Sequence, residues 1–328
     1  MTADFHGHQV HVLGEPGRGG RALALTLNLA DRAGLAGPAE DPESMYWMIQ
    51  IARQVHPGGL GVTEYGPACA DRLWREMLET GSATSAARPS QESHSDFVIA
   101  VDCDGNVAAA CHSINTSLWG STGLFAGGIS IPDVAGAPQF ALARPAPGTH
   151  VTIPASPVIA LRGGRPGLAA GNVGIAGNAV ALQCLHAILG TGQDIAAASS
   201  TPLFHGPDFM TGDSVNTPAE DRSALARRPG GSGPGSRLAS AARRTRSAGV
   251  PAERRWAAML AGIPQVVEDR FDPALLAAVE AWGQPLRTRP VTDPLMPRGF
   301  WGGIVLSSTS PRLSGARTPL LDGQVKGI

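Results

Sequence analysis

The residues best placed to do chemistry are two serines at a junction between a loop and a strand. The loop, residues 82–93, is small, polar and contains proline, and it leads through Ser93-His94-Ser95-Asp96 into an apolar run. A hydroxyl residue at such a junction can attack the carbonyl carbon before it, break the chain and become a new N-terminus, whose α-amine then serves as its general base. A serine at a loop end is also common in ordinary turns, so this pattern alone leaves both interpretations open.

The elements that must position these serines form a predicted β-hairpin. Residues 96–102 and 107–115 are apolar runs on either side of the turn at 103–106, which contains Asp-Gly. Such a pattern is typical of two antiparallel strands. Because the runs are almost wholly apolar, we expect the hairpin to be buried on both faces, between two layers. Cys103 and Cys111 are expected to be small core residues.

The same region resembles the start of the small subunit of the gamma-glutamyltransferases, which are N-terminal-nucleophile hydrolases. In that family a threonine begins a strand ending in Asp-x-Asp-Gly-Asn, and the next strand ends in Thr-x-Asn-Thr. Residues 102–106 (DCDGN) and 113–116 (SINT) match these motifs in order and spacing. Other stretches resemble further parts of the same family: residues 5–34, 152–177, 183–205, 271–286 and 310–324, the last with serine for aspartate in an Asp-Pro-Arg motif.

The resemblance implies a role for five polar residues. Ser95 falls at the nucleophile position, and Ser93 takes that position if two residues are inserted at the start of the strand. Ser113 corresponds to the hydroxyl that supports the nucleophile, although a buried strand serine bonded to backbone is an equal alternative. Asn115 corresponds to a substrate-contacting asparagine. Asp133 is the nearest counterpart of the acid that binds the substrate amine, offset by about two residues.

Two departures from the family restrict the substrate. The Ser-Ser pair that holds the gamma-glutamyl carboxylate corresponds to Ile153-Pro154, and the Gly-Gly oxyanion pair corresponds to Gly174-Ile175. A desolvated carboxylate needs hydrogen-bond donors, and Ile153-Pro154 offers none from its side chains. We therefore expect a small-molecule amide or acyl substrate other than a standard gamma-glutamyl donor, with Gly174 as the remaining oxyanion glycine.

The expected fold class is α+β, an incomplete αββα sandwich of the N-terminal-nucleophile hydrolases whose N-terminal half is missing. Either a second chain supplies that half, or the chain is a truncated, degenerate and non-catalytic member. We divide the sequence into four parts: the end of a large-subunit-like segment with the processing loop (1–94), a small-subunit-like β-sandwich core (95–221), an Arg/Gly/Ser-rich flexible insertion (222–255), and a C-terminal helix and strands of the same domain (256–328).

Periodicity and capping residues predict the remaining elements. Helices are expected at residues 21–34, 42–54 (capped by Asp41), 68–81, 176–189 and 273–283, and strands at 8–13, 129–132, 151–153, 156–161 and, as the final strand, 302–308. Met45, Trp47 and Met48 are expected to pack in the core rather than to contact a cofactor.

Composition narrows the classes of partner. The net charge is −1, which favours neither nucleic acid nor membrane, and nine arginines between 222 and 255 are interpreted as a solvated insertion. The four cysteines lack metal-ligand spacing, so we expect neither a metal nor a cofactor.

The first residues show no signal peptide and no stretch approaches a membrane span, so a cytoplasmic location is expected. Gly and Pro form about a fifth of the chain, which predicts many turns.

Overall fold

The computed structural model describes residues 1–15, 17–55, 65–84, 95–113, 123–130, 146–148, 156–208, 262–293, 296–307, 312–320, 324 and 326. The loop before Ser95 from residue 85 onward and the arginine-rich insertion lie outside these residues.

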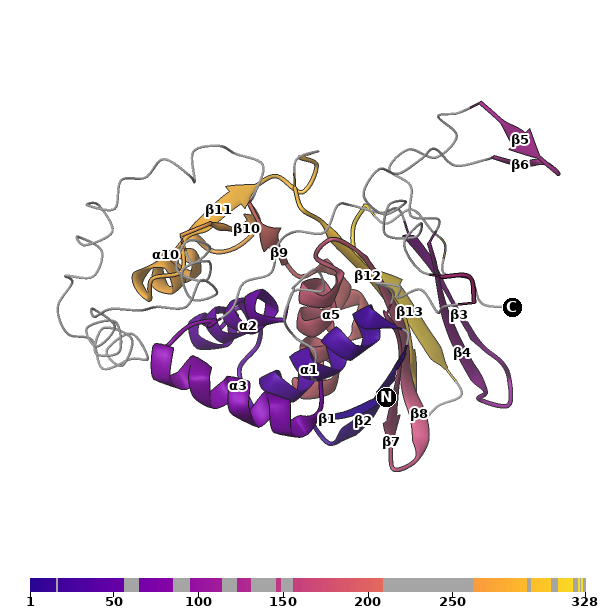
Figure 1. Ribbon diagram of the computed structural model, residues 1–328, viewed down its shortest axis with the longest axis horizontal. Helices are drawn as coiled ribbons and strands as arrows, with labels where there is room; N and C mark the ends of the chain where they lie inside the picture. The colour runs from indigo at the N-terminus through magenta and orange to yellow at the C-terminus, as the bar shows by residue number, and fades with distance from the viewer. Residues whose placement is uncertain are drawn as a thin grey trace.

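A six-stranded antiparallel sheet forms the middle layer (Figure 1). Its strands, in spatial order, are β1 (Thr2–Phe5), β2 (His8–Val12), β7 (Ser156–Arg162), β8 (Arg165–Gly174), β12 (Gly299–Leu306) and β13 (Leu313–Arg317). The strands expected at 8–13, 156–161 and 302–308 are thus confirmed. The expectation that 302–308 is the last strand is wrong, because β13 follows and pairs with β12 along the sheet edge.

Helices cover one face of this sheet (Figure 1). They are α1 (Arg18–Ala33), α2 (Pro42–Gln54), α3 (Pro67–Thr80), α5 (Gly177–Leu185) with its π-helical extension η1 (His186–Gly190), α6 (Ile195–Ser200) and α10 (Pro273–Ala281). The predicted stop and start signals operate as expected: Gly34 and Gly81 end α1 and α3 in left-handed conformations, and Asp41 accepts a hydrogen bond from the Ser44 N–H at 2.9 Å.

The core lies between the sheet and the helices. Met45 and Met48 have no exposed surface and Trp47 is 8% exposed, which confirms that these α2 residues pack in the interior. α1 contacts β1, whereas α5 contacts β8 and β12. A smaller sheet of β9 (Phe204–Pro207), β10 (Gln265–Glu268) and β11 (Leu286–Arg289) continues this side of the molecule.

The predicted hairpin is present as β3 (Ser95–Val101) and β4 (Val107–Ser113), and it packs on the sheet face opposite the helices (Figure 1). Our expectation that both of its faces are buried is wrong. Exposure alternates along both strands, and Val98 on the outer face is 66% exposed. Inward residues pack on β7, β8 and β12, while the outward residues are Asp96, Val98, Ala100, Ala108, Ala110 and His112.

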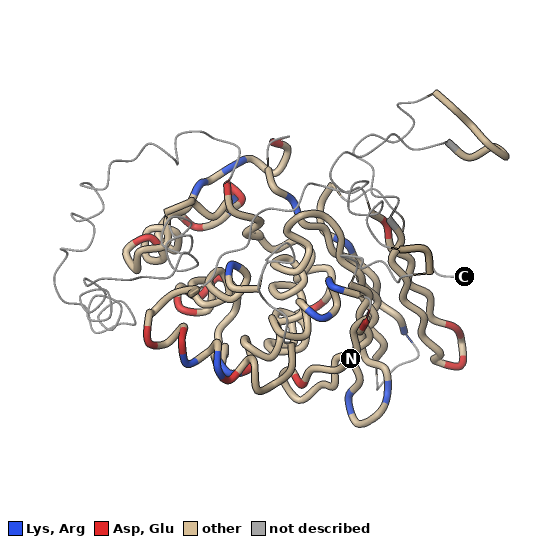
Figure 2. Tube along the Cα trace, viewed as in Figure 1, with Lys and Arg blue, Asp and Glu red and all other residues tan. Residues whose placement is uncertain are grey.

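The outer face of this hairpin carries no lysine or arginine. Figure 2 shows acidic residues at the β3–β4 turn and near the start of β3, with no lysine or arginine on either strand. A second, very short hairpin of β5 (Phe125–Ala126) and β6 (Ile129–Ser130) bears the exposed side chains of Phe125 and Ile129. The strand expected at 129–132 is therefore present in part, and that expected at 151–153 lies outside the described residues.

The two cysteines of the hairpin are not core residues. Cys103 is exposed in the β3–β4 turn, and Cys111 is only partly buried. The expectation for both residues rested on the apolar residues around them, but Cys103 lies in the exposed turn and the strand that carries Cys111 is packed on one face only. Cys69 and Cys184 are the buried cysteines.

Candidate active site

The structure brings together two of the predicted hydroxyl residues. Ser95 is the first residue of β3 and Ser113 the last of β4, and the two are direct partners in the antiparallel register. Ser95 is partly buried and shares the inward face of the hairpin with Phe97. A residue at this position begins a rigid strand immediately after a connecting segment, which is the geometry that an N-terminal nucleophile requires.

The hairpin is fixed on the large sheet by Phe97. A Cβ added to Gly171 would lie 2.5 Å from the Phe97 Cγ, and one added to Gly302 would lie 3.0 Å from its Cζ. Gly171 of β8 and Gly302 of β12 are themselves register partners. These two paired glycines leave a flat surface on the sheet, here called the glycine bed, against which the Phe97 ring packs. This contact sets the position of β3 over β8.

This packing directs Ser95 toward the end of β8. The β3–β4 turn and the β7–β8 turn lie at the same end of the layers in Figure 1, so β3 begins at the opposite end, where β8 stops at Gly174. Gly174 has a φ of +87°, and a Cβ there would lie 2.6 Å from the Arg298 carbonyl oxygen. Only glycine fits both restrictions. We call residues 174–176, between β8 and α5, the Gly174 turn.

The Gly174 turn leads into the N-terminus of α5, which starts at Gly177 without a side-chain cap. The first N–H groups of a helix have no partner within the helix, and they carry the positive end of its dipole. Beneath the turn, Asn172 donates to the Asn178 side chain at 3.1 Å, and Asn178 donates to the Gly19 carbonyl at 3.4 Å. These buried contacts tie β8, α5 and α1 together, so the backbone donors of the turn are held by a rigid frame.

Cys111, the other nucleophilic side chain of the hairpin, is poorly suited to react. Burial raises the pKa of its thiol to about 11, outweighing the hydrogen bonds that the N–H groups of Ser156 and Asn172 offer to the thiolate. With this pKa the Cys111 thiol stays protonated near neutral pH. Because the thiolate is the reactive species, Cys111 is a poor nucleophile. The hydroxyl of Ser95 is the better candidate at this end of the hairpin.

Several predicted site residues lie outside the described part of the chain: Ser93, Asn115, Asp133, Ile153 and Pro154. Their roles stay predictions. Among the described residues, no group of three or more His, Cys, Asp or Glu could hold a metal ion. The described helices also include none with the length and apolar content to cross a membrane.

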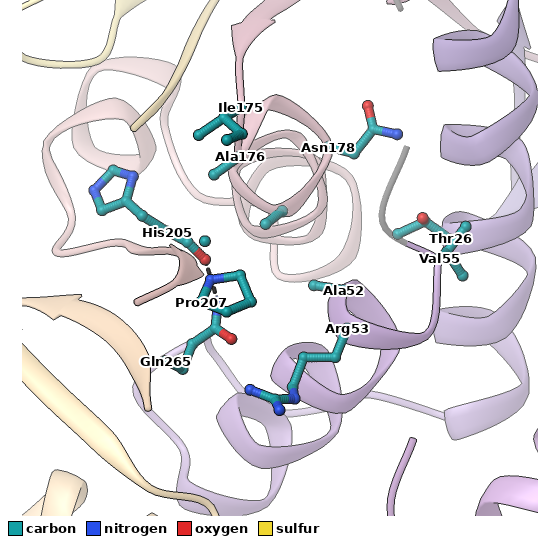
Figure 3. A pocket seen from close by; sticks show the side chains of 12 residues that line it. Thr26, Ala52, Arg53, Val55, Ile175, Ala176, Asn178, His205, Pro207 and Gln265 are labelled. Carbon is teal, nitrogen blue, oxygen red and sulfur yellow. Dashed lines mark hydrogen bonds between the residues drawn. The ribbon is translucent and has the colours of Figure 1, made fainter. Parts of the chain in front are cut away.

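A small cavity backs the Gly174 turn from the helix side (Figure 3). Its volume of about 20 Å³ has room for about one water molecule, so it is too small for an organic substrate. Ile175, Asn178, His205, Gln265 and Arg53 are among its lining residues. Arg53 is 6% exposed and donates to the Ile263 carbonyl at 3.0 Å, and burial lowers its pKa to about 10.

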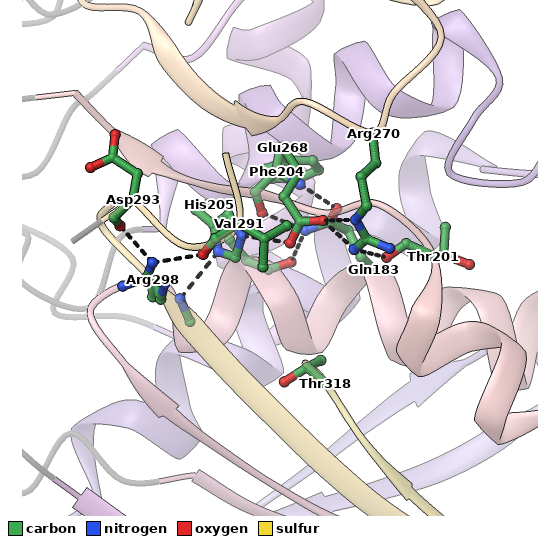
Figure 4. Close-up of polar contacts among 12 residues, drawn as sticks. Gln183, Thr201, Phe204, His205, Glu268, Arg270, Val291, Asp293, Arg298 and Thr318 are labelled. Carbon is green, nitrogen blue, oxygen red and sulfur yellow. Dashed lines mark hydrogen bonds and ion pairs between the residues drawn. The ribbon is translucent and has the colours of Figure 1, made fainter. Parts of the chain in front are cut away.

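The sequence reasoning missed a buried polar cluster beside this cavity (Figure 4). His205 and Glu268 are 3% and 2% exposed, and the His205 Nε2 lies 3.2 Å from a Glu268 carboxylate oxygen. Arg270 donates from Nε to the other oxygen at 3.0 Å. His205 could have been noticed as the end of the Phe-His motif in the stretch 183–205, but Glu268, more than sixty residues away, gave no signal of its own.

Comparisons with known proteins bear on the fold. No family model and no curated protein sequence matches the chain. Among solved structures, cephalosporin acylase from Bacillus halodurans matches with a TM-score of 0.63 at 16% identity, covering 99% of this chain and 52% of the acylase chain. LmbA2991 matches with a TM-score of 0.56 at 18% identity, covering 97% of this chain and 54% of its own.

Gamma-glutamyltranspeptidases are also among the structural neighbours. The enzyme from Pseudomonas nitroreducens has a TM-score of 0.40 at 16% identity and covers 73% of this chain, a likeness too weak to add to the argument. The acylase match, with its TM-score above 0.5, supports the expected fold class. In the described part of this chain, helices cover one face of the large sheet and the β3–β4 hairpin packs on the other. The chain therefore has the fold of the N-terminal-nucleophile hydrolases and spans about half the length of the acylase chain that it matches.

Proposed function

We propose that this chain carries the nucleophile of an N-terminal-nucleophile hydrolase or acyltransferase that acts on an amide or acyl substrate, with Ser95 as that nucleophile. One observation carries the proposal. Ser95 begins β3 opposite Ser113, and the Phe97 contact directs this end of the hairpin toward the Gly174 turn and the N-terminus of α5. A hydroxyl, a supporting hydroxyl residue and a set of backbone N–H donors are the parts that acyl transfer needs.

Activation of this site begins with cleavage of the chain. The Ser95 Oγ attacks the carbonyl carbon of His94, the C–N bond breaks, and the acyl group passes from nitrogen to oxygen as an ester. Water then hydrolyses the ester, which frees the His94 carboxylate, the Ser95 hydroxyl and the Ser95 α-amine. An α-amine has a pKa of about 7.7–8.0, so a substantial fraction is neutral near pH 7.5 and able to act as a base.

The amine and hydroxyl of Ser95 then act together on the substrate. The amine accepts the Oγ proton as the oxygen bonds to the substrate carbonyl carbon, and the developing oxyanion accepts hydrogen bonds from backbone N–H groups at Gly174-Ile175. The protonated amine passes its proton to the leaving nitrogen, which leaves an acyl ester on Ser95. Water or an acceptor amine attacks this ester and regenerates the hydroxyl.

The substrate proposal rests on the sequence at 153–154. Isoleucine and proline replace two hydroxyl residues, so a gamma-glutamyl carboxylate loses two hydrogen bonds, at a cost on the order of 1.5–3 kcal/mol each. We expect slow turnover of gamma-glutamyl-p-nitroanilide, and faster turnover of p-nitroanilides with an uncharged acyl group. The reverse order of rates would contradict this part of the proposal.

The test of the nucleophile is the intact mass of the purified full-length chain. Cleavage before Ser95 gives fragments of residues 1–94 and 95–328 that co-purify under native conditions. Ser95→Ala should stay uncleaved, and Ser93→Ala is the matched control that should cleave as the wild type does. Cleavage that survives Ser95→Ala and stops in Ser93→Ala would transfer the role to Ser93.

The proposal fails if the wild-type chain stays uncut and inert, including in the presence of added candidate partner chains. The remaining interpretation is then a non-catalytic member of the fold. A nucleophile-directed probe separates the two further, because an active Ser95 displaces fluoride from a sulfonyl fluoride and keeps a stable sulfonate ester, whereas Ser95→Ala does not.

We also propose that activity requires a further polypeptide that supplies strands to the second sheet. The outer face of the β3–β4 hairpin is exposed, with Val98 66% exposed in the middle of a row of alanines, and the matched acylase chain is about twice as long. A protein rarely leaves such a strand face open to water, and free strand edges invite pairing. We expect the isolated chain to form oligomers or aggregates through this face.

Light scattering coupled to size-exclusion chromatography tests the open face. Val98→Glu places a charge at its centre, and we expect the variant to shift the chain toward monomer with an unchanged melting temperature. Glu substituted at the exposed Leu78 of α3, which is 50% exposed on the helix side, is the control and should leave the assembly state as it was. A stable wild-type monomer would contradict the proposal.

A further inference from the structure

The Gly174 turn rests directly on the backbone of residues 298–299. The Ala176 N–H donates to the Arg298 carbonyl at 3.1 Å, and that carbonyl also closes over the position that a Gly174 side chain would need. A Cβ added to Gly299 would lie 2.4 Å from the Ala176 carbonyl oxygen. The position of the turn is therefore set by where the Arg298-Gly299 peptide lies.

His205 holds this peptide from the other side. The Gly299 N–H points to the His205 Nδ1 at 3.3 Å, in a place where histidine and glycine are both buried. A backbone N–H can only donate, so Nδ1 must be the unprotonated nitrogen and the ring proton must sit on Nε2. This assignment matches the opposite side of the ring, where Nε2 lies 3.2 Å from a Glu268 oxygen.

Glu268 keeps His205 in that state. Burial alone raises the pKa of this carboxyl, but the hydrogen bonds from His205 and Arg270 and the charge of Arg270 outweigh it and hold the pKa below its ordinary value. An ionised carboxylate accepts only, so it requires the Nε2 proton and excludes the other tautomer. The Arg298 side chain fixes the same peptide from its own end, donating to the carbonyls of Val291 at 2.7 Å and Asp293 at 2.5 Å (Figure 4).

We propose that His205 is a positioning residue for acyl transfer. Glu268 orients the His205 ring, and the ring in turn places the backbone N–H donors of the Gly174 turn by accepting a hydrogen bond from Gly299. The inference rests on the function proposed above, since the turn serves as the oxyanion site there. His205 touches neither substrate nor nucleophile. Its effect passes through the Gly299 N–H to the Arg298-Gly299 peptide. That peptide contacts Ala176 of the Gly174 turn, whose backbone donors stabilise the transition state.

Two substitutions at His205 separate its two hydrogen bonds. In His205→Asn the side-chain oxygen takes the place of Nδ1 and still accepts from Gly299, whereas the contact with Glu268 is lost. In His205→Gln the side-chain amide takes the place of Nε2 and still donates to Glu268, whereas Gly299 loses its acceptor. A role in the turn predicts that Asn is the tolerated residue. A role in satisfying the buried carboxylate alone predicts the reverse.

The first readout needs no turnover. Hydrogen–deuterium exchange of the Ala176 amide reports on its bond to Arg298, and we expect it to be at least about tenfold faster in His205→Gln than in His205→Asn. Peptides from α3 should exchange alike in both variants and in the wild type. Gly299→Ala, which forces a Cβ against Ala176, is the second variant and should speed the same amide even if His205→Asn folds poorly.

The second readout is the rate of acyl transfer by the cleaved full chain. We expect kcat to fall by about tenfold or more in His205→Gln with KM little changed, and by less than about threefold in His205→Asn. A wild-type chain without activity defeats the proposed function, while the exchange comparison still decides on His205. Equal exchange in the two variants, or faster exchange in His205→Asn, overturns the inference.

Discussion

The contact between Phe97 and the glycine bed gives the sharpest test of how the two sheets are joined. In Gly171→Ala the new methyl carbon would stand 2.5 Å from Cγ, 2.7 Å from Cδ2 and 2.8 Å from Cβ of Phe97. Carbon atoms in favourable contact are about 3.5–4.0 Å apart, so the two groups must separate by about 1 Å. Cβ and Cγ cannot swing away as the end of a long side chain can, so the hairpin itself has to lift.

The magnitude follows from two opposing effects. Forcing an extra carbon into a filled contact costs about 1–3 kcal/mol. Replacing a strand glycine by alanine returns up to about 1 kcal/mol, because the unfolded chain loses freedom. We expect Gly171→Ala to lower the free energy of unfolding by about 1–2 kcal/mol, which corresponds to a fall in Tm of about 1.5–3 °C for a chain of this size.

A double-mutant cycle with Phe97→Ala identifies the cause. Phe97→Ala alone should cost about 2 kcal/mol, less than a fully buried phenylalanine, because the ring is only partly covered. With the ring gone, Gly171→Ala should be neutral or stabilising, so the coupling between the two sites is about 1–3 kcal/mol. Gly167→Ala is the control on the same strand, since its Cβ would meet only the Ala160 carbonyl at 3.9 Å.

Urea or thermal unfolding followed by circular dichroism supplies these numbers. Additive effects of Gly171→Ala and Phe97→Ala would refute the packing argument, and with it the placement of Ser95 over the end of β8. A large loss of stability in Gly167→Ala would show that β8 rejects any side chain, whatever lies above it.

Two further predictions concern the helix layer. Asp41→Ala removes the acceptor for the Ser44 N–H and should cost about 1 kcal/mol in urea unfolding, whereas Asp41→Asn, which keeps an acceptor, should cost less. His6 and His186 share a hydrogen bond of 3.0 Å, and burial lowers the pKa of both below that of the unfolded chain. Their contribution to stability is complete above about pH 6.5 and is lost as the pH falls below it, so Tm should drop between pH 7 and 5.5, and drop less in His186→Gln.

The elements with strong local signals could be predicted from the sequence. Asp41 followed by proline, and Gly34 and Gly81 after apolar periodicity, mark helix ends through their own backbone chemistry, without any help from the rest of the fold. The Asp-Gly turn likewise predicted the β3–β4 hairpin. These features depend on residues within a few positions of one another, which is why one sequence is enough to find them.

The burial of the hairpin could not be predicted in the same way. Ala100, Ala108 and Ala110 are apolar residues, but an exposed alanine costs little, and Val98 is the one large apolar side chain that points outward on the two strands. An apolar run therefore fits a strand covered on both faces and a strand covered on one face equally well. Which of the two applies depends on what lies beyond the outer face, and that information is not local.

Part of the candidate site could be predicted and part could not. The pairing of Ser95 with Ser113 follows from the turn and the register, so both were accessible from the sequence. The pair formed by His205 and Glu268 was not, because it joins β9 and β10 across an intervening stretch of more than fifty residues. Contacts at that separation depend on the assembled layers and leave no periodic trace in the chain.

The abundance of glycine has a second explanation beside turns. Gly171 gives Phe97 its place on the sheet, Gly299 lets β12 touch the Gly174 turn, and Gly174 takes a conformation that other residues resist. Each sits inside or at the end of a long strand, where glycine otherwise weakens the sheet. Glycine costs stability at these three points, yet it occurs where backbone must approach backbone or an aromatic ring. We infer that close approach is what this end of the molecule needs, because a site made of backbone donors requires it.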